Sequence, residues 1–156
     1  MTKTLDVRVL GNADAALLRA MLSMFGSAFG ELAIYTSRQP DDEYLSHLLS
    51  SKTFVALAAL SGDEVIGGIA AYVLTKFEQA RSELYIYDLA VAQHHRRRGI
   101  ATALITELQK LAAERGLYVI FVQADIEDEA AIALYTKLGV REDVLHFDIA
   151  PTKSAG

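Results

Sequence analysis

The sequence predicts a mixed α/β fold in which one central, mostly antiparallel sheet carries helices on both faces. Two apolar runs over residues 53–74, joined by a short polar turn, indicate an antiparallel hairpin. A helical run then separates strands predicted over 83–92 and 117–124, and such a crossover requires a parallel pair. The 156 residues are enough for one hydrophobic core, so we expect a single domain over residues 1–150 and a flexible tail over 151–156.

The N-terminal half is predicted to hold one strand and two helices before the hairpin. Residues 5–10 alternate apolar and polar as a half-buried strand does, and Asn12 is a candidate cap for the first helix. Residues 26–39 are expected to be irregular. Gly67 and Gly68, inside the hairpin, suggest a bulge or a close approach of another segment. The second helix, which starts near Pro40, is expected to bury a face formed by Tyr44, Leu45, Leu48 and Leu49.

The C-terminal half is predicted to continue with helix, strand, helix and strand. A helix begins near Gly99, carries apolar residues at helical spacing and ends at Gly116. The run over 117–124 is almost continuously apolar, which predicts a strand buried on both faces. A short helix over 131–138 follows. Residues 144–149 alternate, which predicts a last strand.

Composition and charge exclude several kinds of chemistry. The chain has no cysteine, which rules out disulfides, thiolate zinc sites and cysteine nucleophiles, and its four histidines lack metal-ligand spacing, so we expect no metal. A net charge of −5 argues against a nucleic-acid-binding surface and permits a cationic substrate, although ordinary solubility is the simpler explanation. Neither a signal peptide nor an apolar membrane span is recognisable, so we expect a cytoplasmic protein.

A basic turn joins the strand over 83–92 to the helix that follows it. Three consecutive arginines, Arg96, Arg97 and Arg98, precede Gly99. The start of a helix exposes unpaired N–H groups and the positive end of the helix dipole, so it attracts phosphate. Glycine lets a ligand approach the backbone, and arginine adds positive charge. A solvated basic turn is the alternative, but the pattern favours a pyrophosphate site.

One carboxylate, Asp88, lies inside the same strand, where aspartate is disfavoured. Regular alternation puts its side chain on one face with Leu84, Ile86 and Ala90. A carboxylate on an apolar face must be paired or functional. A structural salt bridge is one interpretation, and a base or substrate clamp near the pyrophosphate site is the other.

Further acidic residues are candidates for holding a cationic substrate. Asp125 and Glu127 belong to an acidic loop over residues 125–129 that directly follows a strand, where clefts form in α/β folds. A solvated charge run explains this loop as readily. Weaker candidates for the same substrate wall are Glu31, Tyr35, Glu78 and Asp148.

Two motifs resemble those of a known enzyme superfamily. Arg96-x-x-Gly99-x-Ala101 follows an apolar strand, and a second motif runs from Ala131 to Gly139 at the expected distance. Together they resemble the GNAT acyl-CoA-dependent N-acetyltransferases over nearly the whole chain, which implies the GNAT acyltransferase fold. Within that superfamily the chain is most similar to the aminoglycoside 3-N-acetyltransferases of type I. The segments that carry this closer resemblance are 51–54, 76–79, 85–91, 122–125 and 146–149.

The resemblance implies a cofactor and the residues that bind it. Acetyl-CoA would be held at its pyrophosphate by backbone N–H groups of the basic turn and helix start, and along its pantetheine arm by a strand edge. Asp128 stands where an asparagine is common and can cap its helix. The residues implied at the cofactor are Leu89, Ala90, Val91, Arg96, Arg97, Arg98, Gly99, Ile100, Ala101, Thr102, Asp128 and Ala131.

The resemblance also implies roles in a reaction. Asp88 would act as base or clamp at the attacking amine, and the Val91 N–H would bind the thioester oxygen. Tyr135 would protonate the leaving sulfur; from periodicity alone it is a core tyrosine. An ordinary aspartate is a poor base, so its pKa would have to be raised, or its contribution would lie in electrostatic placement of the amine.

The expected substrate is a cationic, gentamicin-like aminoglycoside, acetylated on the 3-amino group of its deoxystreptamine ring while both substrates are bound. Such a reaction confers antibiotic resistance. The resemblance further implies a homodimer. Two kinds of alternative stay open: a polyamine or protein-lysine N-acetyltransferase, and a catalytically silent acyl-CoA-binding module.

Overall fold

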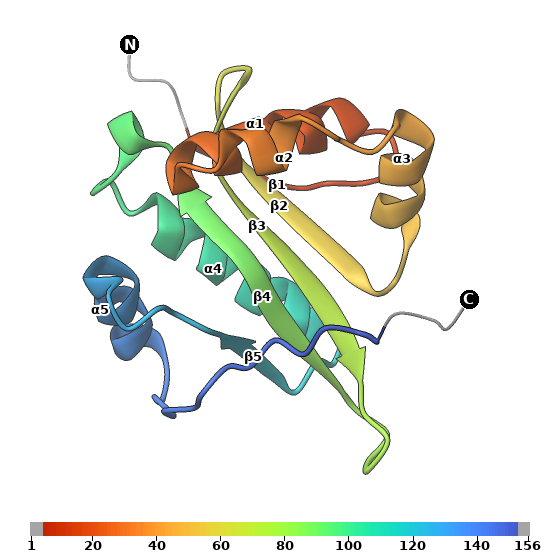
Figure 1. The fold of residues 1–156 in the computed structure, drawn as a ribbon, viewed down its shortest axis with the longest axis vertical. Helices are drawn as coiled ribbons and strands as arrows, with labels where there is room; N and C mark the ends of the chain where they lie inside the picture. The colour runs from red at the N-terminus through yellow and green to blue at the C-terminus, as the bar shows by residue number, and fades with distance from the viewer. Residues whose placement is uncertain (1–4, 153–156) are drawn as a thin grey trace. The chain divides into compact units, whose positions relative to one another are not determined.

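A computed structural model describes residues 5–152 of the chain and contains one five-stranded sheet within them (Figure 1). The described chain forms two compact units, one up to Gln123 and one from Ala124. The single-domain expectation stays a prediction, and residues 153–156 of the predicted tail lie outside the described residues. In chain order the elements are β1 (Leu5–Val9), α1 (Ala15–Phe29), α2 (Leu32–Thr36), α3 (Asp42–Ser50), β2 (Phe54–Ser61), β3 (Glu64–Thr75), β4 (Ser82–Val91), a 3₁₀ turn (Gln93–His95), α4 (Ile100–Glu114), β5 (Val119–Val122) and α5 (Glu129–Leu138).

The sheet confirms the predicted mixed, mostly antiparallel topology. Its spatial order is β1-β2-β3-β4-β5, with antiparallel neighbours throughout except for the parallel pair β4 and β5. α4 connects that parallel pair, as a crossover must. The strand predicted over 83–92 is present as β4. It is the fourth strand, and β3 is central.

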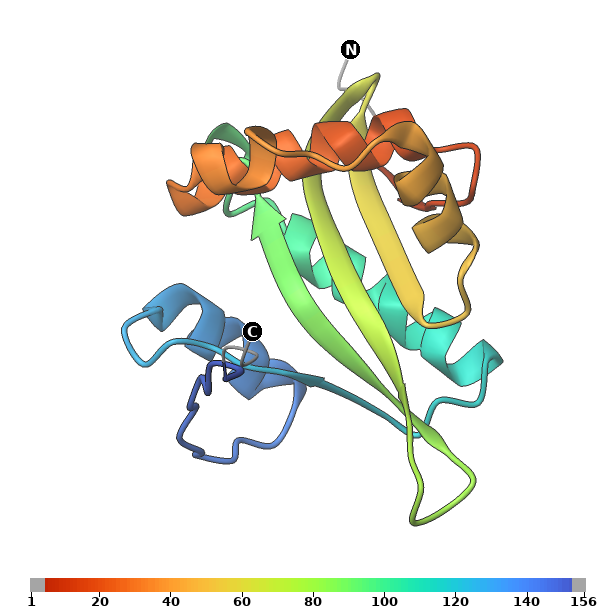
Figure 2. The ribbon, with the colours of Figure 1, turned by 45° about the vertical axis from the view of Figure 1, so that its right-hand side comes forward.

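Helices cover both faces of the sheet, as predicted, and two neighbouring glycines mark which helix lies on which face. A Cβ added to Gly68 would come within 2.7 Å of Met21 Cγ in α1, whereas one added to Gly67 would lie 3.3 Å from Leu104 Cδ1 in α4. The glycine pair therefore permits close helix approaches, and the register of β2 and β3 also shifts beside it, between Gly67 and Val65. Figure 2 shows α1 and α4 on opposite sides of the strands.

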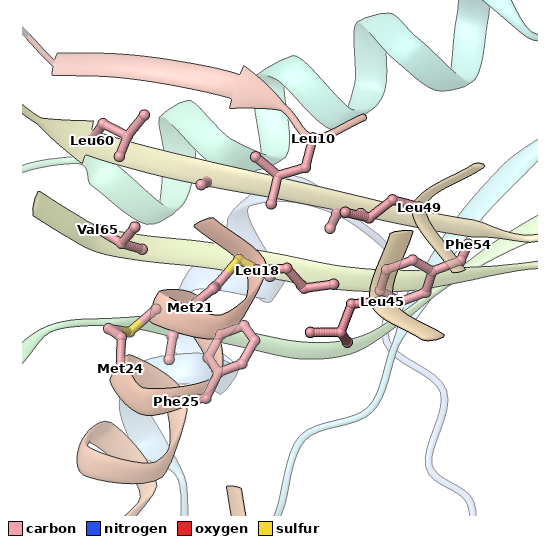
Figure 3. Close-up of a cluster of buried hydrophobic side chains, with 13 residues drawn as sticks. Leu10, Leu18, Met21, Met24, Phe25, Leu45, Leu49, Phe54, Leu60 and Val65 are labelled. Carbon is pink, nitrogen blue, oxygen red and sulfur yellow. The ribbon is translucent and has the colours of Figure 1, made fainter. Parts of the chain in front are cut away.

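One apolar cluster fills the space between the sheet and helices α1 and α3 (Figure 3). Met21 and Phe25 of α1 are almost completely buried there. Burying a side chain of this size contributes about 1.5–3 kcal/mol to folding. The side chains labelled in Figure 3 are Leu10, Leu18, Met21, Met24, Phe25, Leu45, Leu49, Phe54, Leu60 and Val65.

Three expectations for the N-terminal half were wrong. Asp14, not Asn12, precedes α1, and its carboxylate accepts from the Gly11 N–H at 2.8 Å instead of capping the helix. Residues 26–39 are largely helical, because α1 continues to Phe29 and α2 follows a left-handed Gly30; a five-residue helix is too short to show a period. Tyr44 is 59% exposed, since its position in the first turn of α3 turns its ring outward.

Two expectations for the C-terminal half were also wrong. β5 spans only four residues and is partly exposed, because it is an edge strand with one neighbour. Residues 144–149 form no strand; Leu145 is 84% and Ile149 is 90% exposed. Alternation records the period of the side chains, but a strand also needs a hydrogen-bonding neighbour, and no described strand pairs with this segment.

Candidate active site

A bulge in β4 determines where Asp88 points. Ala70 of β3 lies opposite Asp88, but the next residue, Ala71, lies opposite Ile86, so Tyr87 has no partner on β3. An extra residue of this kind shifts the two-residue alternation of its strand and re-aims the side chains that follow.

Because of the bulge, the predicted alternation was wrong in part: Asp88 shares a face with Ala90 but not with Ile86. Asp88 keeps the face of Ala90, which packs in the cluster under α1. Ile86 lies opposite Ala71, two residues from Ile69 and four from Gly67, and therefore faces α4. The Asp88 carboxylate thus leaves the purely apolar α4 face and lies on the side of α1 and α2.

Asp88 is hydrogen-bonded to one predicted site residue, Tyr35 of α2, and a second, Glu31 at the start of that helix, acts on it by its charge. The Tyr35 hydroxyl donates a hydrogen bond to Asp88 Oδ2 at 3.0 Å. Burial raises the pKa of Asp88 above its ordinary value, the bond from Tyr35 opposes the rise, and the nearby charge of Glu31 adds to it. Burial and the adjacent carboxylates also raise the pKa of Tyr35, so its hydroxyl stays protonated and remains a donor.

The structural salt-bridge interpretation of Asp88 fails within residues 5–152. No lysine, arginine or histidine described there forms an ion pair with this half-buried carboxylate. Tyr35 itself is held in place by ring contacts to Phe25 and Phe29, with centroids 6.2 and 5.8 Å away, and its carbonyl accepts from Gln39 Nε2 at 3.1 Å. Asp88 is therefore a carboxylate held in one orientation by Tyr35, with hydrogen-bond acceptor positions that no described cation uses.

The edge of β4 beyond Asp88 lacks a strand partner among the described residues. Pairing with β5 ends at Ile86 and Val122, and Figure 2 shows the two strands diverging from there. The Ala92 N–H donates to Ile66 of β3 at 2.8 Å, so alternation turns the backbone groups of Val91 and Leu89 to the opposite, unpaired edge. An extended ligand can add to such an edge as a further strand does.

The start of α4 is open to an anion. Gly99 is its N-cap in the left-handed region, with φ of 73°, and no side chain caps the first turn. Nothing lies within 4 Å of a Cβ built on Gly99. The N–H groups of Ile100, Ala101 and Thr102 are therefore uncapped, as a phosphate site requires.

The three arginines of the basic turn differ in their positions. Arg96 Nε donates to the Val91 carbonyl at 3.1 Å and its Nη2 to the Ala28 carbonyl at 3.5 Å, so its side chain ties the turn to β4 and α1. Arg97, which has a φ of 65°, and Arg98 are exposed. The positive charge available to a ligand at the turn is accordingly that of Arg97 and Arg98.

Glu78 lies apart from Asp88. It belongs to the β3–β4 hairpin, which projects from the sheet in Figures 1 and 2, and it pairs with Lys76 at 3.7 Å and Arg81 at 3.4 Å. Six residues of strand separate Ser82, at the hairpin, from Asp88, a distance of roughly 20 Å at about 3.3 Å per residue. Glu78 is a member of a surface ion-pair group and not of the Asp88 site.

The remaining predicted residues belong to the unit that begins at Ala124. Asp128 Oδ1 accepts a hydrogen bond from the Ala131 N–H at 3.1 Å, which confirms the predicted helix cap. The Asp128 oxygen and the Ala131 N–H are therefore already paired with each other. Burial and the charge of Asp128 raise the pKa of Tyr135 to about 12. The other residues of this set are Asp125 and Glu127, which are exposed in the acidic loop, and Asp148, which lies 2.8 Å from His146 Nε2.

Three tyrosines next to Asp88 were missed by the sequence analysis. Tyr72 of β3 lies opposite Tyr85 of β4, and Tyr87 contacts both rings. The spacing of Tyr85 and Tyr87 by two residues was visible in the sequence. Their closeness to Asp88 depended on the bulge, which no local pattern marks.

Neither a metal-binding cluster nor a membrane-spanning helix occurs within the described residues 5–152. No group of three or more histidine or acidic side chains there is arranged to hold a metal ion. None of the helices in that range has the length and apolar composition needed to cross a bilayer.

A parallel strand pair that separates beside an uncapped helix start is the arrangement of a protein that holds an extended, phosphate-bearing ligand. Residues 18–140 match the profile of the acetyltransferase (GNAT) family, and the chain belongs to this family. Acetyltransferases of this family use acetyl-CoA, which confirms the expected cofactor. The open start of α4 and the free edge of β4 fit such a molecule.

Known proteins of this kind resemble the chain along most of its length. A solved aminoglycoside acetyltransferase from an uncultured soil metagenomic sample is 60% identical, with a TM-score of 0.93 over 96% of this chain and 99% of that one. A second one from an uncultured soil metagenomic sample, solved with sisomicin, is 30% identical, with a TM-score of 0.87 over 95% and 97%. Rat N-acetyltransferase 8B is 28% identical over 89 residues, which are 57% of this chain and only 40% of that protein.

Proposed function

We propose that this chain transfers the acetyl group of acetyl-CoA to the 3-amino group of deoxystreptamine aminoglycosides. The observation that carries the proposal is Asp88, a half-buried carboxylate without an ion-pair partner in residues 5–152, next to a free strand edge. A cationic amine supplies the partner that this carboxylate lacks. The two solved aminoglycoside acetyltransferases, which are 60% and 30% identical, support this choice of substrate.

Asp88 removes the proton from the attacking amine, directly or through a water molecule. The amine must be neutral to attack, yet an alkylamine is mostly protonated near neutral pH. The raised pKa of Asp88 makes it a stronger base than an ordinary aspartate. The hydrogen bond from Tyr35 fixes the carboxylate in one orientation, which keeps the amine in line for transfer.

Acetyl-CoA, when bound, supplies the acetyl group as an activated thioester. The uncapped N–H groups of Ile100, Ala101 and Thr102 would hold its pyrophosphate, assisted by the charges of Arg97 and Arg98. Leu89 and Val91 would bond its extended arm through their backbone groups, and the Val91 N–H would stabilise negative charge on the acetyl oxygen. Tyr135 would donate a proton to the departing sulfur. Asp128 and Ala131 would contribute by capping the helix that carries Tyr135.

The chemical consequence of the reaction is the loss of one positive charge from the antibiotic. Aminoglycosides are polycations, and binding of a polycation to RNA phosphates weakens with each charge removed. A cell that contains this activity would therefore resist the drug.

A homodimer and a cytoplasmic location belong to the same proposal, and light scattering on the purified protein measures the oligomeric state.

A turnover screen with acetyl-CoA tests the proposed function. Thiol release is measured with gentamicin, spermidine and a lysine-containing peptide at matched concentrations. We expect efficient turnover of gentamicin and far slower release with the other two amines. Turnover of spermidine or peptide without gentamicin would contradict the proposal. Tight CoA binding without thiol release from any amine would identify a silent acyl-CoA-binding module instead.

A further inference from the structure

A row of aromatic rings crosses the sheet next to Asp88. The row, here called the tyrosine surface, comes from four neighbouring strands. Successive ring centroids lie 5.4, 5.7, 5.9 and 4.6 Å apart, so the rings form one continuous surface. In spatial order, its members are Phe54, Tyr72, Tyr87, Tyr85 and Phe121.

The middle of the tyrosine surface is accessible. Tyr72 is 38% exposed and Tyr87 is 62% exposed, while Phe54 is buried and anchors the row to the core. Tyr87, two residues after Tyr85, shares its face and contacts the rings of Tyr72 and Tyr85, and the bulge brings Asp88 onto that same face. Aromatic rings of this size that are exposed together on one sheet face indicate a contact site and not an ordinary solvated surface.

Asp88 gives this surface a negative end. Asp88 directly follows Tyr87 and lies opposite Ala70, two residues from Tyr72 on the same face of the sheet. Its charge adds, after burial and the charge of Tyr87, to the raised pKa values of Tyr72 and Tyr85. Glu31 is close enough to Asp88 to raise its pKa. The phenols stay neutral and keep their hydroxyl hydrogens, so the surface offers aromatic faces, hydroxyl groups and carboxylates together.

We propose that the tyrosine surface binds the amino-sugar rings attached to the ring that is acetylated. An amino sugar presents ammonium groups, which aromatic faces attract; C–H faces, which stack on rings; and hydroxyls, which pair with phenols. A linear polyamine has no ring face to stack. The tyrosine surface would therefore select multi-ring aminoglycosides at the site where Asp88 acts. This proposal rests on the proposed function.

Steady-state kinetics with gentamicin test the role of Tyr87. The ring is removed in Tyr87→Leu and retained in Tyr87→Phe, and Tyr72→Leu repeats the test at the neighbouring ring. Phe77→Leu is the matched control, because Phe77 is 99% exposed in the β3–β4 hairpin, away from this surface. We expect Tyr87→Leu to raise the KM for gentamicin roughly tenfold, with kcat and the KM for acetyl-CoA within about twofold of wild type.

Two further measurements make the kinetics specific. Tyr87→Phe and Phe77→Leu should keep the gentamicin KM within about threefold, and the KM for 2-deoxystreptamine, which lacks the attached rings, should change little in Tyr87→Leu. Ring signals of Tyr72 and Tyr87 in the NMR spectrum of the wild-type protein should shift on titration with gentamicin, which tests the contact without any variant. Melting temperatures of all variants identify any loss of folding.

The outcomes separate the two proposals. If the wild-type protein acetylates no aminoglycoside, the proposed function fails. If it acetylates gentamicin but Tyr87→Leu and Tyr72→Leu leave the KM unchanged and the ring signals do not shift, only the tyrosine-surface proposal fails. A dimer in the wild type that dissociates in Tyr87→Leu would show that a second copy of the chain covers the surface, and would likewise overturn the proposal.

Discussion

The Tyr35 hydroxyl donates a 3.0 Å hydrogen bond to Asp88 Oδ2, joining α2 to the bulge of β4 across 53 positions of sequence. Ring contacts from Phe25 and Phe29 of α1 hold Tyr35, so the bond connects the helical face of the sheet to the proposed base. The bond stabilises the ionised carboxylate and lowers a pKa that burial has raised. It therefore lowers the pH at which Asp88 loses its proton, although burial keeps the pKa above its ordinary value.

Removal of this hydroxyl should shift the pH profile of the enzyme. Ionised Asp88 is the active form, so kcat/KM falls as pH falls through its pKa. Tyr35→Phe deletes the interaction that lowers this pKa, and the acidic limb of the profile should move to higher pH. Measurement of kcat/KM for gentamicin against pH detects the shift.

Tyr118→Phe provides the control for this experiment. Tyr118 also donates a hydrogen bond to a carboxylate, that of Glu83, near the base of the β3–β4 hairpin. The variant loses the same type of bond away from Asp88, and its acidic limb should match wild type. An equal shift in both variants, or none in Tyr35→Phe, would show that Tyr35 does not act through Asp88.

Asp88→Asn should separate activity from stability. General bases contribute roughly 10²–10⁴-fold to rate, so kcat should fall by about 10²-fold or more while CoA binding persists. Because the folded-state pKa of Asp88 is raised, stability falls as pH rises from the unfolded pKa through the folded pKa, and the ionised carboxylate destabilises the fold above both.

At pH 7 the Asn variant should therefore melt at the same temperature as wild type or at a higher temperature. Any gain in melting temperature should vanish below the ordinary aspartate pKa. Thermal melts at pH 7 and pH 3.5, together with thiol-release assays, test both parts. Near-normal kcat would remove Asp88 as the base. A clearly lower melting temperature at pH 7 would show that Asp88 has a structural role.

Gly99→Ala should weaken cofactor binding beyond its effect on the fold. Alanine at a φ of 73° costs about 1–2 kcal/mol in backbone strain, and its methyl group would occupy the space that an anion needs. Gly116→Ala is a matched control, with φ of 68° and equally open surroundings, at the end of α4 instead of its start. Calorimetry should show the Kd for CoA raised roughly tenfold in Gly99→Ala alone; equal affinities in both variants would argue against the phosphate site.

Tyr135→Phe should lower kcat and leave both KM values nearly unchanged. Its pKa of about 12 keeps the phenol protonated through the usual assay range, as a proton donor must be. Tyr135 should accordingly contribute no alkaline limb below about pH 10 in the wild-type kcat profile. A Tyr135→Phe enzyme with normal kcat would assign the proton donation to another group or to water.

Much of the scaffold could be predicted because its patterns are local. The helical spacing in α1 and α4 and the apolar runs of β2 and β3 all reflect the period of a single element facing a core. Asp88 and Gly99 could be identified for the same reason, since each departs from the residue types that its element favours.

The details that shape the site could not be predicted because they depend on distant residues. The bulge at Tyr87 reflects the pairing of β4 with β3, and it separates Asp88 from Leu84 and Ile86, with which alternation groups it. The Tyr35 contact requires α2, which is too short to show a period. Arg96 resembled a phosphate ligand, but its side chain binds the carbonyls of Val91 and Ala28 once the turn has folded.

The position of the acetyl group on the product tests whether this enzyme acetylates the 3-amino group. Gentamicin is converted with acetyl-CoA by the wild-type protein, and the purified product is examined by NMR. We expect a single acetyl group on the 3-amino nitrogen of the deoxystreptamine ring. Acetylation at the 6′-amino group or at a mixture of amines would contradict it, because an amine held at one carboxylate, Asp88, should react at one position.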